Sequence, residues 1–278
     1  MPEKILRLGY TECTLLFIRW LSHHKNVNNI EMIMTKKNMI KWLYTTSGYY
    51  DTTQEGHHFN VMHNGEDPIT YTKYMTIILD FIKDSDIFNF LIHNMSLQTQ
   101  IEEFKRAINP KNNTPISQEM VFNFIADKKI LIISPFAKLI KTQIDSGNCK
   151  MIYPNTPIIA NSVIYTFPYT FFNNGPHNNI LETSEYIFNN IIETIKEEYD
   201  SVLISCGAYS CLIAKKFYDI GKNVCINGGE IQTHFGILNN RNKGWNKTPT
   251  INQEYWIMDI PEEYKPANYN KIEGGCYW

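Results

Sequence analysis

Arg7, Gly9 and Glu12 stand close together near the start of the chain, where the apolar segment KILRL gives way to a helical pattern. A guanidinium can bind a phosphate through two parallel hydrogen bonds, and a carboxylate can bind a metal ion or act as a base. A capping acid beside a surface arginine would give the same pattern, and the three residues alone favour that structural interpretation. The chemical hypothesis therefore needs support from elsewhere in the chain.

Glycine turns follow two later apolar runs, SVLISC and NVCIN, and a third run, KILIIS, ends in Ser-Pro-Phe. Glycine lets a backbone approach a ligand closely, and the helix that follows offers free N–H groups to an anion. The turns therefore predict a site for a phosphate or diphosphate. Glycines that only serve tight turns are an equally good interpretation, because the chain has no G-x-G-x-x-G and no Walker lysine. The candidate binding residues are Ser134, Gly207, Ala208, Tyr209, Asn227, Gly228 and Gly229.

Histidines give a weaker signal. His234 follows the glycine pair at 228–229 by about one and a half helical turns, so it is expected to face the same crevice. His57, His58 and His63 lie in a polar, glycine-containing segment and are expected to be solvated rather than bound to a metal. No G-x-S-x-G elbow is present, so the sequence gives no support to a hydrolase triad.

Buried strands must position these turns. Continuous apolar runs that alternate with helical patterns predict right-handed βαβ units and a parallel sheet covered on both faces. KILIIS, SVLISC and NVCIN are expected to be neighbouring strands. The expected strands span residues 129–135, 158–167, 201–206 and 223–227, and the expected helices span 137–145, 181–198 and 209–218.

The first hundred residues have mainly helical patterns, expected at 11–21, with Thr11 as a cap, at 32–44 and at 74–95. Residues 45–68 are expected to form a loop, and the polar segment 109–117, with two prolines, is the best linker. We therefore expect a mainly helical part, 1–110, that carries the Arg7 motif, and a Rossmann-like βαβ half, 118–278. The predicted fold class is α/β, with a mainly parallel sheet flanked by helices.

Composition excludes several classes of protein. The chain has 278 residues, with 26 Lys and Arg against 28 Asp and Glu, so it has no general attraction for nucleic acid or anionic lipid. No apolar stretch approaches 18 residues, and the first residues do not resemble a signal peptide. A cytoplasmic protein with six free cysteines is expected, with no nucleic-acid or membrane partner. The aromatic tail is expected to dock, with Tyr277 and Trp278 mostly buried. The oligomeric state stays open.

Five segments, taken in order, resemble a family of bacterial and giant-virus proteins that is similar to the GT-D glycosyltransferases of the DUF1792 type. The stretch 203–237 and the last six residues are the most specific parts. The segments are R-x-G-x-x-E at 7–12, K-x-x-x-I-S-P-F at 129–136, L-I-S-C-G-A-Y at 203–209, I-N-G-G-E-I-Q-T-H-F-G-I at 226–237 and E-G-G-C-Y-W at 273–278.

The resemblance implies a transferase that takes a sugar from a nucleotide-diphosphate sugar and passes it to an acceptor. Neither the donor sugar nor the acceptor follows from the sequence. It also implies that the diphosphate lies against the glycine turns. Arg7 would offset the charge of the leaving diphosphate, and Glu12 would bind a metal or accept a proton from the acceptor. Gly9, Tyr10 and Thr11 would complete the binding site.

Two positions depart from the family pattern. The early motif of GT-D enzymes is similar to R-x-G-D-G-E, whose Asp and Glu form a D-x-E metal site. Here Tyr10 stands at the Asp position and Thr11 at the middle Gly. Because Mn²⁺ and Mg²⁺ prefer several oxygen ligands, this leaves three alternatives: a metal-independent enzyme, a carboxylate borrowed from Glu230, or an inactive protein. A degenerate nucleotide-binding protein and a structural, virion-associated protein therefore stay open as alternatives.

Overall fold

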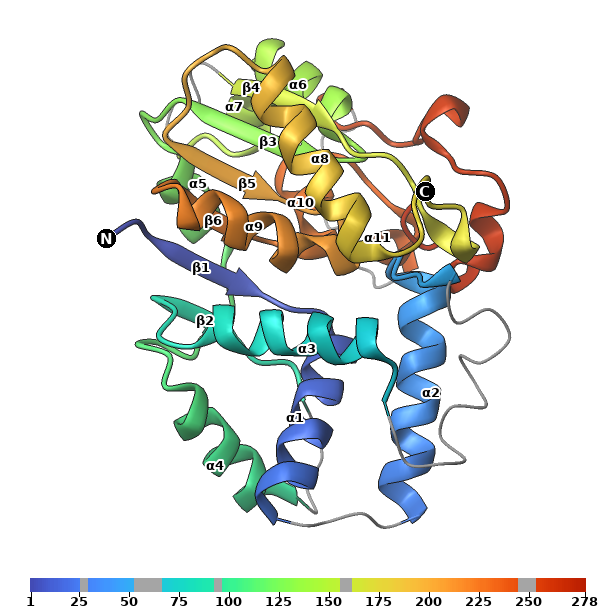
Figure 1. Cartoon of the computed structure of the whole chain (residues 1–278). Coiled ribbons are helices and arrows are strands. Elements are labelled where there is room, and N and C mark those ends of the chain that lie inside the picture. Colours follow the sequence, from blue (N-terminus) through green and yellow to red (C-terminus); the bar gives the residue numbers. More distant parts are fainter. Residues whose placement is uncertain (26–29, 53–66, 93–96, 156–161, 245–253) are drawn as a thin grey trace.

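A computed structural model gives the fold, and it describes residues 1–25, 30–52, 67–92, 97–155, 162–244 and 254–278 (Figure 1). Within these ranges six strands form one sheet, and all neighbouring pairs are parallel. The predicted α/β class with a parallel sheet is therefore confirmed. The strands are β1 (Lys4–Arg7), β2 (Ile87–Asn89), β3 (Ile130–Ser134), β4 (Ser162–Thr166), β5 (Ser201–Ile204) and β6 (Asn223–Ile226).

The strand order is β2-β1-β6-β5-β3-β4. The three runs expected to be neighbours, now β6, β5 and β3, do lie side by side, with Val202 paired to Val224 on one side and to Leu131 on the other. Every residue of β3 and β5 is buried. Their sequences are continuously apolar because helices cover both faces of a central parallel strand, so every side chain of the strand is buried.

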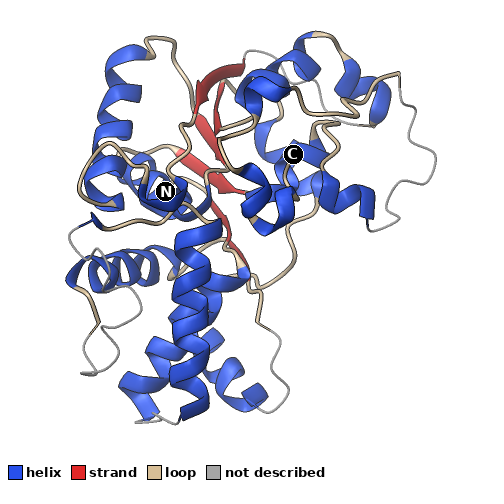
Figure 2. Cartoon of the chain, turned by 90° about the vertical axis from the view of Figure 1, so that its right-hand side faces the viewer, coloured by secondary structure: helices blue, strands red, loops and turns tan. Residues whose placement is uncertain are grey.

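Helices lie on both sides of the sheet (Figure 2). The buried apolar side chains form two clusters, one on each face of the sheet. Side chains alternate along each strand: in β5, Val202 and Ile204 belong to one cluster and Leu203 to the other. The first cluster includes side chains of α1 (Tyr10–Lys25), α2 (Ile30–Thr46), α3 (Ile69–Ile82), α4 (Gln98–Ile108), α8 (Ile180–Thr194) and α9 (Ser210–Asp219). The second cluster includes side chains of α5 (Gln118–Ile125), α6 (Ala137–Asp145), α7 (Asn148–Ile152), α10 (Ile231–His234) and the C-terminal segment.

The N-terminal part also contributes to the sheet. Strand β1 lies between β2 and β6, so residues 1–110 supply two strands to the sheet that the later half completes. Helices α1, α2 and α4 extend beyond the sheet on the side of β1 and β2 (Figure 1). Because β1 is paired with β6, the Arg7 motif lies at the carboxyl edge of the sheet beside the end of β6.

Several predicted elements need correction. The helix expected at 74–95 is wrong beyond Ile82, because the polar segment KDSD breaks it: Lys83 is extended and Asp84 has a φ of 53°. Strand β2 follows instead. Thr11 does not cap α1; the helix begins one residue earlier, and the Gly9 carbonyl accepts the Cys13 N–H at 3.1 Å. Helix α8 ends at Thr194 rather than at residue 198.

Part of the expected loop at 45–68 and the start of the strand expected at 158–167 lie outside the described residues. Residues 53–66, which include His57, His58 and His63, are among these. Of the described helices, none combines the length and the apolar character needed to cross a membrane.

Candidate functional site

A cavity of about 170 Å³ opens at the carboxyl ends of β1, β5 and β6. It brings together the early motif and the two glycine turns, which lie about 200 residues apart in the sequence. The predicted residues that line it are Arg7, Gly9, Glu12, Gly207, Ala208, Tyr209, Gly228 and Gly229.

The sheet topology explains why a crevice forms at this point. Helix α1 leaves β1 over one face of the sheet, and α10 follows the neighbouring strand β6 on the opposite face. Where adjacent parallel strands send their helices to opposite faces, the chain opens at the carboxyl edge, and ligands of such sheets bind there.

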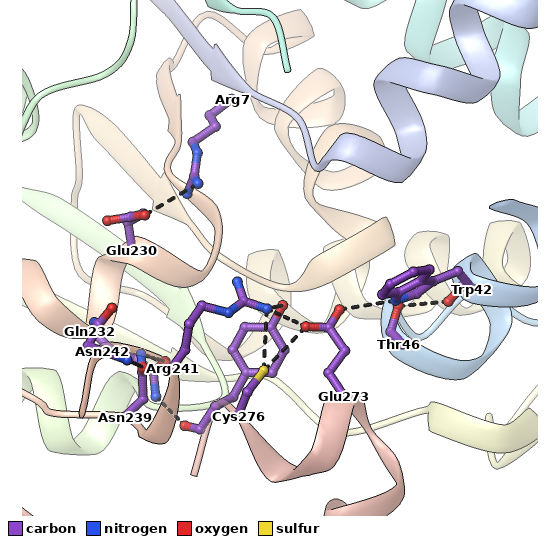
Figure 3. Close-up of polar contacts among 11 residues, drawn as sticks. Arg7, Trp42, Thr46, Glu230, Gln232, Asn239, Arg241, Asn242, Glu273 and Cys276 are labelled. Atoms are coloured by element: carbon purple, nitrogen blue, oxygen red, sulfur yellow. Dashed lines mark hydrogen bonds and ion pairs between the residues drawn. The ribbon is translucent and has the colours of Figure 1, made fainter. Parts of the chain in front are cut away.

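Arg7 is held across the cavity by partners from the other end of the chain (Figure 3). Its Nη1 donates to the backbone carbonyl of Asn227 over 2.8 Å, and its Nη2 lies 3.5 Å from Oε1 of Glu230. A Cβ at Gly228 would come within 3.2 Å of Nη1. Burial lowers the pKa of Arg7, but an arginine remains charged in proteins. The site therefore carries a positive charge directly over the second glycine turn.

Gly207, in the turn Gly207–Tyr209 before α9, packs against the end of α2. Its φ is +55°, and a Cβ at this position would overlap the carbonyl oxygen of Ser47. The Ala208 N–H donates to the same oxygen over 2.8 Å. Because only glycine tolerates both the φ and the close approach, this turn fixes the N-terminal part against the later half.

Glu12 forms part of the inner wall and is only 6% exposed. Its carboxylate folds back over Gly9, whose missing Cβ makes room for Oε2. Burial raises the pKa of Glu12 above its ordinary value, and a hydrogen bond from its own backbone N–H opposes this shift. A carboxyl group in such surroundings favours its neutral form.

Five predicted site residues do not line the cavity. Tyr10 is 48% exposed, and Thr11 is buried within α1. The Ser134 hydroxyl accepts the Phe136 N–H at 3.1 Å and so stabilises the turn after β3. Asn227 contributes its backbone carbonyl to Arg7, but its side chain points to His234.

His234 packs behind the second glycine turn instead of facing the crevice. Its Nδ1 lies 2.8 Å from Nδ2 of Asn227, and it is only 8% exposed. Burial lowers the pKa of His234 to about 4, so the ring is neutral near pH 7. The helical spacing placed His234 near the turn, but the contact with Asn227 directs its ring away from the cavity.

The aromatic tail closes one side of the cavity. Trp278 is 4% exposed, as predicted, whereas Tyr277 is less completely buried. The Gln232 Nε2 donates to the Tyr277 carbonyl over 2.8 Å, and the Arg241 guanidinium lies 4.7 Å from the centre of the Tyr277 ring. Glu273 accepts hydrogen bonds from Arg241 and from Trp42 in α2, so the tail contacts both parts of the chain (Figure 3).

Two further segments of the wall were missed by the sequence prediction. One is Ser47-Gly48 at the end of α2, where Gly48 has a φ of +76°. The other is the aromatic stretch 167–171, FPYTF, whose Thr170 hydroxyl donates to the Gly48 carbonyl over 2.9 Å. A glycine after an amphipathic helix was the available signal for the first, whereas the second joins the site only through tertiary contacts.

The donor set at the cavity does not match a divalent-metal site. Glu12 is the only carboxylate in the described wall, and Glu230, the candidate second ligand, is paired with Arg7. Across the described ranges, no three His, Cys, Asp or Glu residues are grouped so that they could hold a metal ion. Hard cations prefer several oxygen ligands, so these residues do not fit Mn²⁺ or Mg²⁺.

Comparison of the chain with protein-family models, with curated proteins and with solved structures gives no match.

Proposed function

We propose that the chain binds a nucleotide-diphosphate sugar in this cavity and acts as a glycosyltransferase of the GT-D-like type. One observation carries the proposal: the Arg7 guanidinium, at the end of β1, shares a cavity with the glycine turns that follow β5 and β6. The resemblance to GT-D-like proteins rests on these same segments, so the motif evidence and the geometry point to one site.

The chemistry of the site suits a diphosphate. Arg7 can offer a planar pair of N–H donors to phosphate oxygens. Glu230 is 39% exposed and only 3.5 Å from Arg7, so a phosphate can replace it as the arginine's partner. A cation held at the departing diphosphate would stabilise the charge that develops there as the glycosidic bond breaks.

The size of the cavity indicates which part of the ligand it encloses. Pockets that enclose a whole drug-sized ligand usually measure roughly 300–1,000 Å³, and this one is about 170 Å³. It therefore encloses only part of such a ligand. We assign the diphosphate and the attached sugar to it, with the nucleoside extending past Tyr169 and Phe171, which also line the cavity.

A nucleotide-binding protein without transferase activity is the second candidate. Tyr10 at the position of the family's Asp, and Glu12 as the single carboxylate of the described wall, favour it. Binding alone does not separate the two candidates, because both require the same diphosphate site. Release of UDP from a UDP-sugar, with or without an added acceptor, separates them.

The test is calorimetric titration of the purified protein with UDP, followed by incubation with radiolabelled UDP-sugars. The proposal expects saturable binding of UDP and release of UDP from at least one sugar donor. Saturable binding without release would support the non-catalytic candidate. Absence of UDP binding at millimolar concentration would overturn the proposal.

A further inference from the structure

The surroundings of Glu12 in the cavity wall differ chemically from those of Arg7. Tyr74 lies near Glu12, and Leu8 and Ile78 also line the cavity, so the acid belongs to a mostly apolar wall. The Tyr74 hydroxyl is already engaged, because it donates to the Ala208 carbonyl over 3.0 Å. The Arg7 guanidinium is directed to Asn227 and Glu230 rather than to Glu12.

The Glu12 side chain thus has no partner among the described side chains, although it is more than nine-tenths buried. Its own backbone N–H donates to the carboxylate, and no described side chain supplies a further hydrogen bond. A buried carboxyl group that lines a cavity keeps hydrogen-bonding capacity that the polar groups of a ligand bound there can use.

We propose that Glu12 is a specificity-determining residue that binds a hydroxyl group of the donor sugar through hydrogen bonds, rather than a metal ligand or a base. This inference rests on the proposed function, because the sugar reaches Glu12 only when the diphosphate lies at Arg7. A carboxyl group accepts a hydrogen bond from a hydroxyl in either protonation state, and its protonated form also donates one, so a sugar hydroxyl matches it without bringing a charge into the cavity.

Two other ligand groups fit less well. An anionic phosphate has no proton to donate, so it cannot satisfy the carbonyl oxygen of Glu12, and its charge favours the Arg7 guanidinium. An ammonium group would require Glu12 to ionise, which its apolar neighbours and its burial oppose. The neutral hydroxyl of a sugar ring avoids both costs.

The test compares UDP with UDP-glucose and UDP-galactose by titration calorimetry, using the wild-type protein, Glu12→Gln and Glu12→Leu. The amide of Gln keeps a donor and an acceptor, whereas Leu keeps only the volume. We expect the better sugar nucleotide to bind about ten-fold more tightly than UDP to the wild-type protein. In Glu12→Gln, the ratio of sugar-nucleotide affinity to UDP affinity should stay within about three-fold of the wild-type ratio. In Glu12→Leu, the sugar nucleotide should bind no more tightly than UDP, while UDP still binds.

Thr14→Val is the matched control. Thr14 is buried in the same helix, outside the cavity wall, and donates to the Tyr10 carbonyl over 2.8 Å. This variant should keep the wild-type ratio of UDP-sugar to UDP affinity, and thermal unfolding checks that each variant is folded.

Two results would overturn the inference and leave the diphosphate site intact. In the first, Glu12→Leu keeps the wild-type ratio for both sugars. In the second, Glu12→Gln loses as much affinity as Glu12→Leu, as a charged role would require. Failure of the wild-type protein to bind UDP would overturn both this inference and the proposed function, so the two failures are distinguishable.

Discussion

The Arg7 guanidinium donates to the backbone carbonyl of Asn227 over 2.8 Å, although 220 residues separate them in the sequence. Their strands, β1 and β6, are neighbours in the sheet, so the two carboxyl ends meet at one edge. This contact holds a positive charge 3.2 Å from the position that a Cβ at Gly228 would occupy. The candidate site is therefore built by the sheet itself rather than by a single local motif.

Gly207→Ala is expected to destabilise the protein by about 3 kcal/mol or more, because the added Cβ meets backbone at Ser47 and the φ of +55° is strained for alanine. Gly221→Ala is the matched control: its φ is +85°, but nothing lies within 4 Å of the added carbon. Strain alone should cost this control about 1–2 kcal/mol. Urea denaturation measures the free energy of unfolding of both variants. If both variants lost the same free energy of unfolding, the close approach of Ser47 would not be the reason that position 207 requires glycine.

Trp278→Ala is expected to lower the free energy of unfolding by about 3–5 kcal/mol, because the buried ring packs against Phe136, Tyr169 and Phe171. Met151→Ala serves as a control, since Met151 is 56% exposed and should change stability by less than about 0.5 kcal/mol. Thermal and urea denaturation give both values. A Trp278 variant as stable as the Met151 variant would mean that the tail does not contribute to the core.

Lower pH is expected to destabilise the protein through His234. Burial lowers the pKa of its ring from 6.5 to about 4, so between these values the unfolded chain binds the proton and the folded protein does not. The stability contributed by the neutral ring is complete above about pH 6.5 and decreases as the pH falls toward 4, by up to about 3 kcal/mol.

His234→Gln tests this expectation, because glutamine does not titrate. Urea denaturation from pH 4 to 7.5 should show that the difference in stability between the wild-type protein and the variant shrinks as the pH falls. Parallel curves for the two proteins would contradict a buried, neutral His234.

The central sheet could be predicted from the sequence because its strands are continuous apolar runs, as in KILIIS and SVLISC. Strand β2 could not, because Ile87 to Asn89 is a three-residue strand that continues the apolar spacing of the preceding helix. Only its pairing with β1, which no local pattern encodes, makes it a strand.

The candidate site was predictable where it follows strand ends and not where it depends on tertiary contacts. Arg7, Glu12 and the glycine turns meet as expected because parallel strands share one carboxyl edge. Ser47 and Gly48 join the wall because Gly207 packs on the end of α2, a contact between residues 160 positions apart. The prediction that His234 faces the cavity was wrong. It rested on the helical spacing between His234 and the glycine pair at 228–229, whereas the hydrogen bond with Asn227 directs the ring away from the cavity.

Titration of UDP into the wild-type protein and into Arg7→Ala tests the central claim most directly. Arg19→Ala is the control: Arg19 lies on α1 outside the cavity wall, and its Nη1 is 3.9 Å from a carboxylate oxygen of Asp67. Thermal unfolding confirms that each variant is folded. We predict that Arg7→Ala weakens UDP binding by about ten-fold or more, because a charge-assisted hydrogen-bonded pair contributes roughly 1.5–3 kcal/mol, and that Arg19→Ala binds UDP normally. Equal UDP affinity in Arg7→Ala and the wild-type protein would contradict the assignment of this cavity as a diphosphate site.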